Sequence, residues 1–331
     1  MTEQTAGVGE RKSGSSGYSP ERFFQDFGLV LIFVVVVGVL VVLSPGAFAR
    51  PANLIGIIKQ ASINGVLAMG MMFVIISGGI DLSVGSIVAF TGVVAASLGH
   101  PGEYPLALTI AAPIALGAAI GAVNGVSVAY VGIPSFIVTL AGMIVFRGAA
   151  LIASDGSPVF GVSGDFETIA GGFVGDVVPY LAIYFIVVAL ASAFLLKLTV
   201  FGRRVYAIGG NPIAAGVSGI NVRALQTSVY VISGALAGFA GLLLASRTVS
   251  GSPTAGEGYE LNAIAAVIIG GVSMSGGVGR WYGPVIGALL IAVIGNGLDI
   301  LNVSSYYQLV IQGLIIYFAV MADVRSKGSL R

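Results

Sequence analysis

The chain has 331 residues, of which 56% are hydrophobic and only 9% are charged, and its formal net charge is +1. Because soluble domains carry roughly 25% charged residues, this composition excludes a water-soluble fold and predicts an all-α integral membrane protein, whose helices pair their backbone polar groups internally. The small net charge gives no reason to expect nucleic-acid binding, and the absence of cysteine excludes disulfides, thiolate metal sites and thiol nucleophiles.

The N-terminal segment is polar and mixed in charge, and the first apolar run starts only near Phe27. A cleavable signal peptide has a different leader, so we expect a disordered cytoplasmic tail over residues 1–26. The transmembrane domain is then expected over residues 27–323, and a second cytoplasmic tail over residues 324–331.

Ten apolar runs are long enough, or nearly so, to cross a bilayer as helices, and we expect about ten transmembrane helices. The runs are 27–44, 61–79, 83–99, 105–128, 134–153, 177–199, 225–246, 259–273, 282–298 and 305–322. The eighth run is short and requires burial in protein or local thinning of the bilayer to span it.

The basic residues set the orientation of these spans. An even number of spans places both termini on one side, and putting them inside leaves eleven of the 15 Lys and Arg residues in cytoplasmic segments. The four on the outer side are Arg50, Lys59, Arg147 and Arg247. Since cytoplasmic loops carry the excess of Lys and Arg in membrane proteins, we expect an N-in, C-in topology.

Two glycine-broken segments, 74–92 and 267–285, share one pattern in which an apolar run enters a Gly-Gly pair, passes a polar elbow and resumes. Such a pair predicts a transporter built from internal repeats. Both elbows fall on the cytoplasmic side of the ten-span map, which makes this pair parallel, whereas a wider repeat of spans two to five against seven to ten would be inverted. Both readings stay open. The elbow residues are Gly78, Gly79, Asp81, Gly270 and Gly271.

Several polar residues stand out against this apolar background. Asp81 is interpreted as a cap for the following helix in preference to a substrate contact, and the single histidine, His100, as a solvated loop residue. The acidic outer loop 154–176 is equally a solvated loop or a docking surface. Four asparagines in or at the ends of apolar spans are candidates for a translocation path, although such amides more often join helices. They are Asn64, Asn124, Asn262 and Asn296.

The cytoplasmic loop 200–224 carries a short helix signal. Asn211 is a good N-cap and Pro212 fits the first helical position. Ile213, Val217 and Ile220 then recur on one face. The predicted helix has about two turns, far too few to span a bilayer, and either lies on the membrane surface or docks into a groove on a partner.

Six motifs stand in order along the chain: GGIDLSVGS at 78–86, VNGVSVAYVGIPSFIVTLAGM at 123–143, FRGAALIASDGSP at 146–158, FGRRVYAIGGNPIAAGVSGIN at 201–221, PTAGEGYELNAIAAVIIGG at 253–271 and SSYYQLVIQGLII at 304–316. Together they resemble the ribose-type sugar permeases of bacterial ABC importers. The resemblance covers about residues 45–325.

This resemblance implies a multi-pass permease of the bacterial inner membrane, which pairs as a homodimer or with a second permease. It implies a cytoplasmic ATP-binding subunit and a periplasmic sugar-binding protein as partners, and no catalytic residue, cofactor or metal in this chain. The loop 211–221 corresponds to the coupling helix that docks into the ATPase. Relatives often carry Glu and Arg where Ile213 and Gly216 stand here, which puts any charged contact at these places in question. The coupling residues are thus Asn211, Pro212, Ala214, Ala215, Ser218 and Gly219.

The source of energy follows from two further observations. The chain has no GxxxxGK[ST] phosphate loop, so it cannot bind ATP in the usual way. Ion-coupled transporters usually place ionisable residues at mid-membrane, whereas Asp81, Arg147, Glu260 and Asp299 fall at an elbow or near outer boundaries of the predicted spans. We therefore expect an ATP-driven importer of a monosaccharide or similar polyol that works by alternating access. An autoinducer-2-type permease of the same family, an ion-coupled secondary transporter and a passive channel are the alternatives.

Overall fold

The computed structural model describes residues 20–328, so residues 1–19 of the expected N-terminal tail and the last three residues of the chain lie outside it. In chain order its elements are α1 Pro20–Leu43, α2 Pro51–Ile76, α3 Val84–Leu98, α4 Leu106–Val126, the π-helix η1 Ser127–Val131, α5 Ser135–Ala153, α6 Gly164–Gly171, β1 Phe173–Val174, β2 Val178–Pro179, α7 Tyr180–Leu198, α8 Val200–Gly210, α9 Pro212–Val217, α10 Val222–Thr248, α11 Tyr259–Ile269, α12 Gly283–Ile300 and α13 Ser305–Gly328. The two strands pair antiparallel as a small hairpin.

Each predicted apolar run contains one helix, namely α1, α2, α3, α4, α5, α7, α10, α11, α12 or α13. Seven are long and apolar enough to cross a membrane, whereas the apolar part of α1, α3 and α11 are shorter. The largest difference is at α2, which begins at Pro51 and not at residue 61. Pro51 starts a helix well, although Lys59 and Gln60 lower the hydropathy of its first half. At the other end of the chain, α13 continues as a helix into the expected C-terminal tail.

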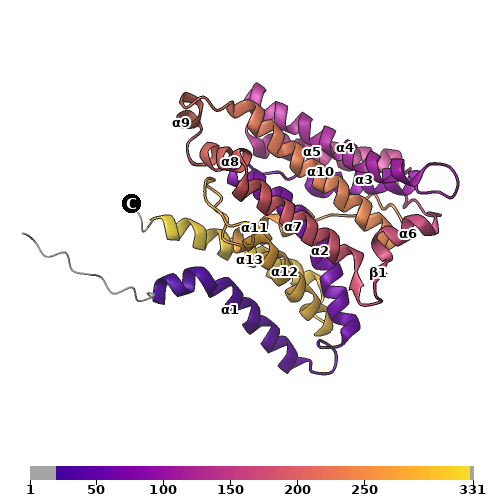
Figure 1. Cartoon of the computed structure of the whole chain (residues 1–331). Helices are drawn as coiled ribbons and strands as arrows, with labels where there is room; N and C mark the ends of the chain where they lie inside the picture. Colours follow the sequence, from indigo (N-terminus) through magenta and orange to yellow (C-terminus); the bar gives the residue numbers. More distant parts are fainter. Residues whose placement is uncertain (1–19, 329–331) are drawn as a thin grey trace, which may run out of the picture.

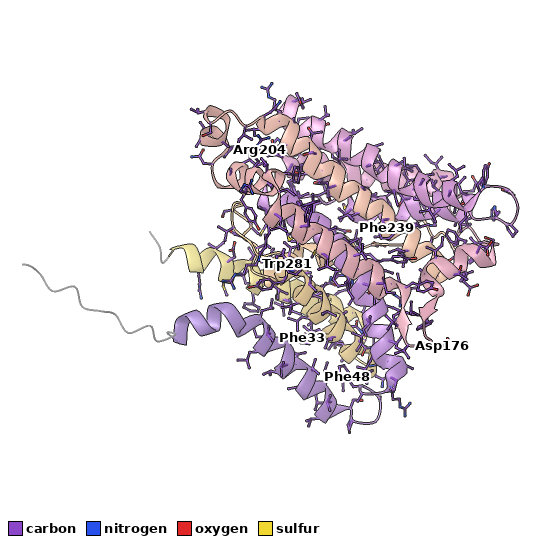
Figure 2. The ribbon with its side chains drawn as sticks, viewed as in Figure 1. Phe33, Phe48, Asp176, Arg204, Phe239 and Trp281 are labelled. Atoms are coloured by element: carbon purple, nitrogen blue, oxygen red, sulfur yellow. The ribbon has the colours of Figure 1, made fainter. Side chains whose placement is uncertain are left out.

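The apolar helices lie side by side, and different elements cap the two ends of the bundle (Figure 1). α8 and α9 lie at one end, which we call the α8 end, together with the start of α1 and the end of α13. α6 and the β1–β2 hairpin lie at the opposite end, the α6 end. Figure 2 shows Arg204 of α8 and Asp176 of the hairpin turn at these opposite ends. α2 lies at the centre of the core, with every residue from Ala61 to Ile76 buried.

α4 and α10 approach until their backbones touch. A methyl group at Gly117 of α4 would overlap the carbonyl oxygen of Gly234 of α10, and one at Gly121 would overlap the carbonyl oxygen of Tyr230. Lipid tails are as apolar as leucine, so helices in a bilayer gain little from burying apolar side chains and pack through small residues instead. At this pair of helices, close packing explains the choice of glycine.

Two non-helical segments run inside the bundle. The first, residues 77–83 between α2 and α3, enters from the α8 end, where the Gly277 N–H donates to the Ile76 carbonyl at 2.8 Å. Its Asp81 lies deeper, where it accepts a hydrogen bond from Ser233 midway along α10 at 3.0 Å. Because backbone polar groups need partners, non-helical backbone at membrane depth is tolerated only where protein covers it or where it lines a cavity.

The second segment, residues 249–258 between α10 and α11, enters from the α6 end. It runs antiparallel to α3, since Gly251 packs against Ala96 near the end of α3 and Gly256 packs against Gly85 at its start. At 1.5 Å per helical residue this contact extends over roughly 16 Å of α3. The segment is therefore re-entrant, and α11 starts deep in the bundle.

These two segments bear on the internal repeat. The sequence analysis paired the glycine-broken segments 74–92 and 267–285, and in the structure the elbows of both segments lie at the α8 end. The structure instead gives 77–98 and 249–269 a shared form, a non-helical segment of turns and coil followed by a short helix, and the two run in opposite directions. This geometry favours the inverted pairing over the parallel one. The sequence left both pairings open because position along the fold, and not a residue pattern, relates these two segments.

Candidate functional site

A cavity of about 470 Å³ lies between α2, α11, α12 and α13 and the end of α10. It is in the half of the bundle nearer the α6 end. Ligand pockets commonly measure roughly 300–1,000 Å³, so the cavity suits a small molecule. Its polar lining consists of Gln60, Asn64, Arg247, Asn262, Asn296, Asp299, Gln308 and Gln312.

The cavity brings together three of the four asparagines that the sequence proposed for a translocation path. Asn64 comes from α2, Asn262 from α11 and Asn296 from α12. Asn124 of α4 is not among the lining residues. It is 2% exposed and donates to the Ser83 hydroxyl at 2.8 Å, so it joins helices away from the cavity.

Neighbouring side chains hold the lining amides in place. Gln312 of α13 donates to the Asn262 side-chain oxygen at 2.6 Å. Asn296 and Asn53 exchange two hydrogen bonds, of 2.8 and 3.0 Å. Since an amide carries both donors and acceptors, these pairs keep further hydrogen-bonding capacity toward the cavity.

The two charged residues of the lining also contact amides. Arg247, at the end of α10, donates to the Gln60 side-chain oxygen at 3.2 Å. Asp299 of α12 accepts from Gln308 of α13 at 2.8 Å. The lining therefore combines one cation, one anion and six amides, which gives hydrogen-bonding surface without an excess of one charge.

Asn64 differs from the other lining amides. Its side chain is 3% exposed, and its buried Oδ1 accepts no hydrogen bond from any described residue. An unpaired buried acceptor costs roughly 1–3 kcal/mol. Asn64 is therefore the lining amide whose side-chain oxygen keeps unused hydrogen-bonding capacity, and protein atoms cover this oxygen in the present conformation.

Sequence reasoning missed five lining residues: Gln60, Arg247, Asp299, Gln308 and Gln312. A signal for some of them was present. Gln60 and Asn64 stand four residues apart in one apolar helix, as do Gln308 and Gln312 in another, and this spacing places each pair on one helix face. Nothing in the sequence indicated that the two faces meet.

Asp81 lies deeper than the sequence predicted. It is 0% exposed and accepts hydrogen bonds from the N–H and hydroxyl of Ser83 at 3.1 and 2.6 Å, as well as from Ser233 of α10. The sequence placed Asp81 at an elbow on the cytoplasmic side of the spans, whereas its carboxyl group reaches Ser233 midway along α10. The physical reason is that residues 77–83 are not helical, so the chain between α2 and α3 runs into the bundle instead of turning back at its end.

The expected short helix is present as α9. The Asn211 side chain accepts from the Ala214 N–H at 2.9 Å, and Pro212 occupies the first turn. The helix ends at Val217, and Gly219 follows with a φ of +82°, a conformation that glycine adopts without strain. Its two apolar side chains point outward, with Ile213 78% and Val217 87% exposed.

The other coupling candidates divide between two surfaces. Ala215 is buried against the chain itself, whereas Ala214 and Ser218 are exposed. The sequence treated the two alanines as one small surface for a partner, but the turn of α9 directs Ala215 inward. The outward face consists of Ile213, Ala214 and Val217 with the end of the helix.

α8 connects α9 to both elbows. A methyl group at Gly209 would overlap the Ile76 carbonyl oxygen at the end of α2 and would come within 2.5 Å of the Gly277 nitrogen. The Tyr206 hydroxyl donates to the Gly279 carbonyl at 2.9 Å. Burial raises the pKa of Tyr206, which keeps this hydroxyl protonated as a donor. A displacement of α8 would therefore reach the ends of both elbows through backbone contacts.

The α6 end carries the acidic loop 154–176. Ser163 caps α6 by accepting from the Phe166 N–H at 3.3 Å, and Val159 pairs with Gly251 across two 2.9 Å backbone hydrogen bonds. His100 lies in the loop after α3, as the sequence predicted, with its side chain 32% exposed. Its Nε2 donates to the Phe160 carbonyl at 2.9 Å and so ties the acidic loop to this turn.

Comparison with known proteins adds the following. A family profile described as branched-chain amino acid transport system / permease component matches residues 53–320. The ribose import permease protein RbsC of Escherichia coli (strain K12) is 42% identical over 326 residues, 98% of this chain and 99% of that protein. The D-allose transport system permease protein AlsC of the same strain is 40% identical over 320 residues, 96% and 98% of the two chains. The L-arabinose ABC transporter permease protein AraH of Azospirillum brasilense is 41% identical over 305 residues, 92% and 89%. No solved structure matches this chain.

Proposed function

The chain belongs to the family described as branched-chain amino acid transport system / permease component, and we propose its function from the sugar permeases that it matches over nearly their whole length. It is the permease subunit of an ABC importer for a monosaccharide. It is a transport component and not an enzyme, and ATP hydrolysis belongs to a separate cytoplasmic ATPase subunit. A periplasmic binding protein delivers the sugar.

The amide-lined cavity is the observation that best supports a sugar as the transported substrate. Six amides, one cation and one anion line it, and both charges already contact glutamine side chains. A sugar is a neutral polyol whose hydroxyl groups donate and accept hydrogen bonds, as amides do. A charged substrate would lose its hydration on entering the cavity, and the lining has no excess of opposite charge to compensate. This loss of hydration is costly inside a membrane. We therefore place the translocation path through this cavity.

We further propose that all ten apolar helices cross the bacterial inner membrane, with the α8 end in the cytoplasm. The basic residues Arg203, Arg204 and Arg223 lie in or beside α8 and α9, while the acidic loop 154–176 lies at the α6 end. The positive-inside rule favours this orientation, and the described start of α1 and end of α13 both lie at the α8 end (Figure 1). The transmembrane permease domain then covers residues 27–323.

The partners take opposite ends in this arrangement. The ATPase receives the exposed Ile213 and Val217 of α9, the proposed coupling helix, and the binding protein docks on the α6-end loops. A second permease copy, identical or related, completes the transporter. Motion of α9 passes through α8 to the two elbows, because Gly209 lies against the backbone of Ile76 at the end of α2 and of Gly276 and Gly277 in the second elbow. The free energy for alternating access thus comes from ATP hydrolysis on the partner.

An autoinducer-2-type permease of the same family is the second candidate for the substrate, since a small furanosyl molecule also offers hydroxyl groups to the lining amides. An ion-coupled transporter is favoured less. Asp81 is buried inside the bundle, but three hydrogen bonds from Ser83 and Ser233 already engage its two oxygens.

Replacement of Asn64 by leucine tests the path directly. In proteoliposomes that contain the ATPase and binding protein, Asn64→Leu should reduce the maximal rate of ribose or allose uptake at least tenfold, while the binding protein still stimulates ATP hydrolysis. Thermal stability should not fall, because the lost side-chain oxygen makes no hydrogen bond in the folded chain.

The matched control is Asn302→Gly, a change of an exposed asparagine outside the cavity. It should leave uptake unchanged. If Asn64→Leu lowers stability and leaves the uptake rate of the folded fraction intact, Asn64 only joins helices and the path lies elsewhere.

A further inference from the structure

α5 contacts both re-entrant segments. Near its start, the Ser135 hydroxyl accepts from the Ile80 N–H at 3.3 Å, and the Thr139 hydroxyl donates to the Ile80 carbonyl at 3.4 Å. Near its other end, Arg147 donates to the carbonyls of Pro253 and Ala255. One helix therefore holds the 77–83 segment and the 249–258 segment at once.

The contact made by Arg147 is the stronger of the two. One nitrogen of its guanidinium group, Nη1, donates to the Pro253 carbonyl at 2.9 Å and to the Ala255 carbonyl at 2.8 Å. Charge-assisted hydrogen bonds are shorter and stronger than neutral ones, and a guanidinium group presents several donors in a fixed plane. The Pro253 and Ala255 carbonyls have no partner within a helix, because their segment is not helical. Arg147 of α5 supplies the donor for both.

The carboxyl group of Glu260 lies near this contact. Glu260 stands in the first turn of α11, and its carboxyl group lies against Gly85 in the first turn of α3, where any larger residue would overlap it. Arg147 is within electrostatic range of this carboxyl group. Arg147 therefore pairs two backbone carbonyls of the 249–258 segment near the carboxyl group of Glu260, at the point where the starts of the two short helices meet.

We propose that Arg147 is a positioning residue of the transport cycle, which holds the 249–258 segment against α3 and couples it through α5 to the 77–83 segment. The proposal rests on the proposed function. Arg247 of the cavity stands two residues before the 249–258 segment and Asn262 four residues after it, so displacement of the segment moves two lining residues. Because α5 contacts Ile80 near its start and the 249–258 segment near its end, a displacement of the backbone at Ile80 is transmitted through α5 toward the α6 end of the bundle.

Arg147→Met removes the donors and keeps an unbranched apolar stem, and Arg147→Lys keeps the charge without the planar group. We expect Arg147→Met to lower sugar uptake at least tenfold while ATP hydrolysis continues and no longer responds to the binding protein. Arg147→Lys should recover part of both properties. Arg50→Met, which changes an exposed arginine before α2, is the control and should alter neither.

A second measurement does not depend on transport. The chain has no cysteine, so a single Ala255→Cys change reports on the segment alone. Its reaction with a membrane-impermeant thiol reagent should be at least fivefold faster in the Arg147→Met background than with Arg147 present. This rate also separates the proposal from the proposed function, because it can rise even if the complex transports no sugar.

Two outcomes would overturn the proposal. One is an unchanged labelling rate at position 255 together with normal uptake by Arg147→Met. The other is a parallel fall of thermal stability, uptake and ATP hydrolysis in both Arg147 variants, since this would assign the arginine to the stability of the fold alone.

Discussion

Val249 shows how a single residue can carry strain at a functional boundary. It follows α10 with a φ of 54°, a left-handed conformation that β-branched residues rarely adopt. The Val249 N–H donates to the Ser246 carbonyl and the Ser250 N–H to the Ala245 carbonyl, a helix ending that usually has glycine at this place. The strained residue stands where the 249–258 segment begins.

We expect Val249→Gly to stabilise the folded chain by about 1 kcal/mol or less. Relief of the left-handed penalty, roughly 1–2 kcal/mol, exceeds the entropy cost of glycine, roughly 0.5–1 kcal/mol. The midpoint of thermal unfolding in detergent measures the change. Val249→Ala is the control, because alanine keeps the strain; equal midpoints for the two variants would show that the conformation costs nothing.

For individual residues, the sequence predicted which polar side chains need a partner more reliably than it predicted which partner each one has. It singled out Asn64, Asn262 and Asn296 because amides in apolar runs need partners, and the cavity brings these three together. It could not separate Asn124 from them, since the bond from Asn124 to Ser83 joins helices that no local pattern relates.

At the scale of elements, the apolar runs predicted where helices form, because burial in lipid demands length and hydropathy that are visible locally. The 249–258 segment could not be predicted in the same way. Its polar, glycine-rich composition is typical of a surface loop, yet it lies along α3 because Gly251 and Gly256 permit close contact there. Its contacts with α3 and α5, which no local pattern predicts, show that this loop enters the bundle.

α9 is the element that most directly tests coupling. Ile213→Asp and Val217→Asp should each reduce ATP-driven uptake at least tenfold and weaken co-purification of the ATPase, because a charge on this exposed apolar face opposes docking. Membrane insertion should be unaffected, since both side chains already face outward.

Gly216→Ala is the control for α9. A methyl group there meets only the Val222 side chain, at 3.9 Å, so uptake should stay normal. The coupling assignment fails if both aspartate variants transport normally with the ATPase bound. Ala215 is unsuited to this test, because it is buried within the chain.

At the scale of the whole molecule, orientation determines which partner meets which surface. The absence of cysteine allows single-cysteine labelling. Ser157→Cys, in the α6-end loop, should react with an impermeant thiol reagent in intact cells. Ala207→Cys, on the exposed face of α8, should react only after the membrane is opened. Labelling of position 207 from outside would reverse the proposed topology and exchange the surfaces assigned to the two partners.

The central claim is that this chain moves a monosaccharide only with free energy from a separate ATPase. The most direct measurement is uptake of labelled ribose, allose, arabinose and xylose into proteoliposomes that hold the purified chain with or without its ATPase and binding protein. We predict concentrative uptake of at least one sugar that requires ATP and both partners, that persists when ion gradients are collapsed, and that stops when the phosphate-binding lysine of the ATPase is replaced. Concentrative uptake by the chain alone, driven by a proton or sodium gradient, would contradict the account.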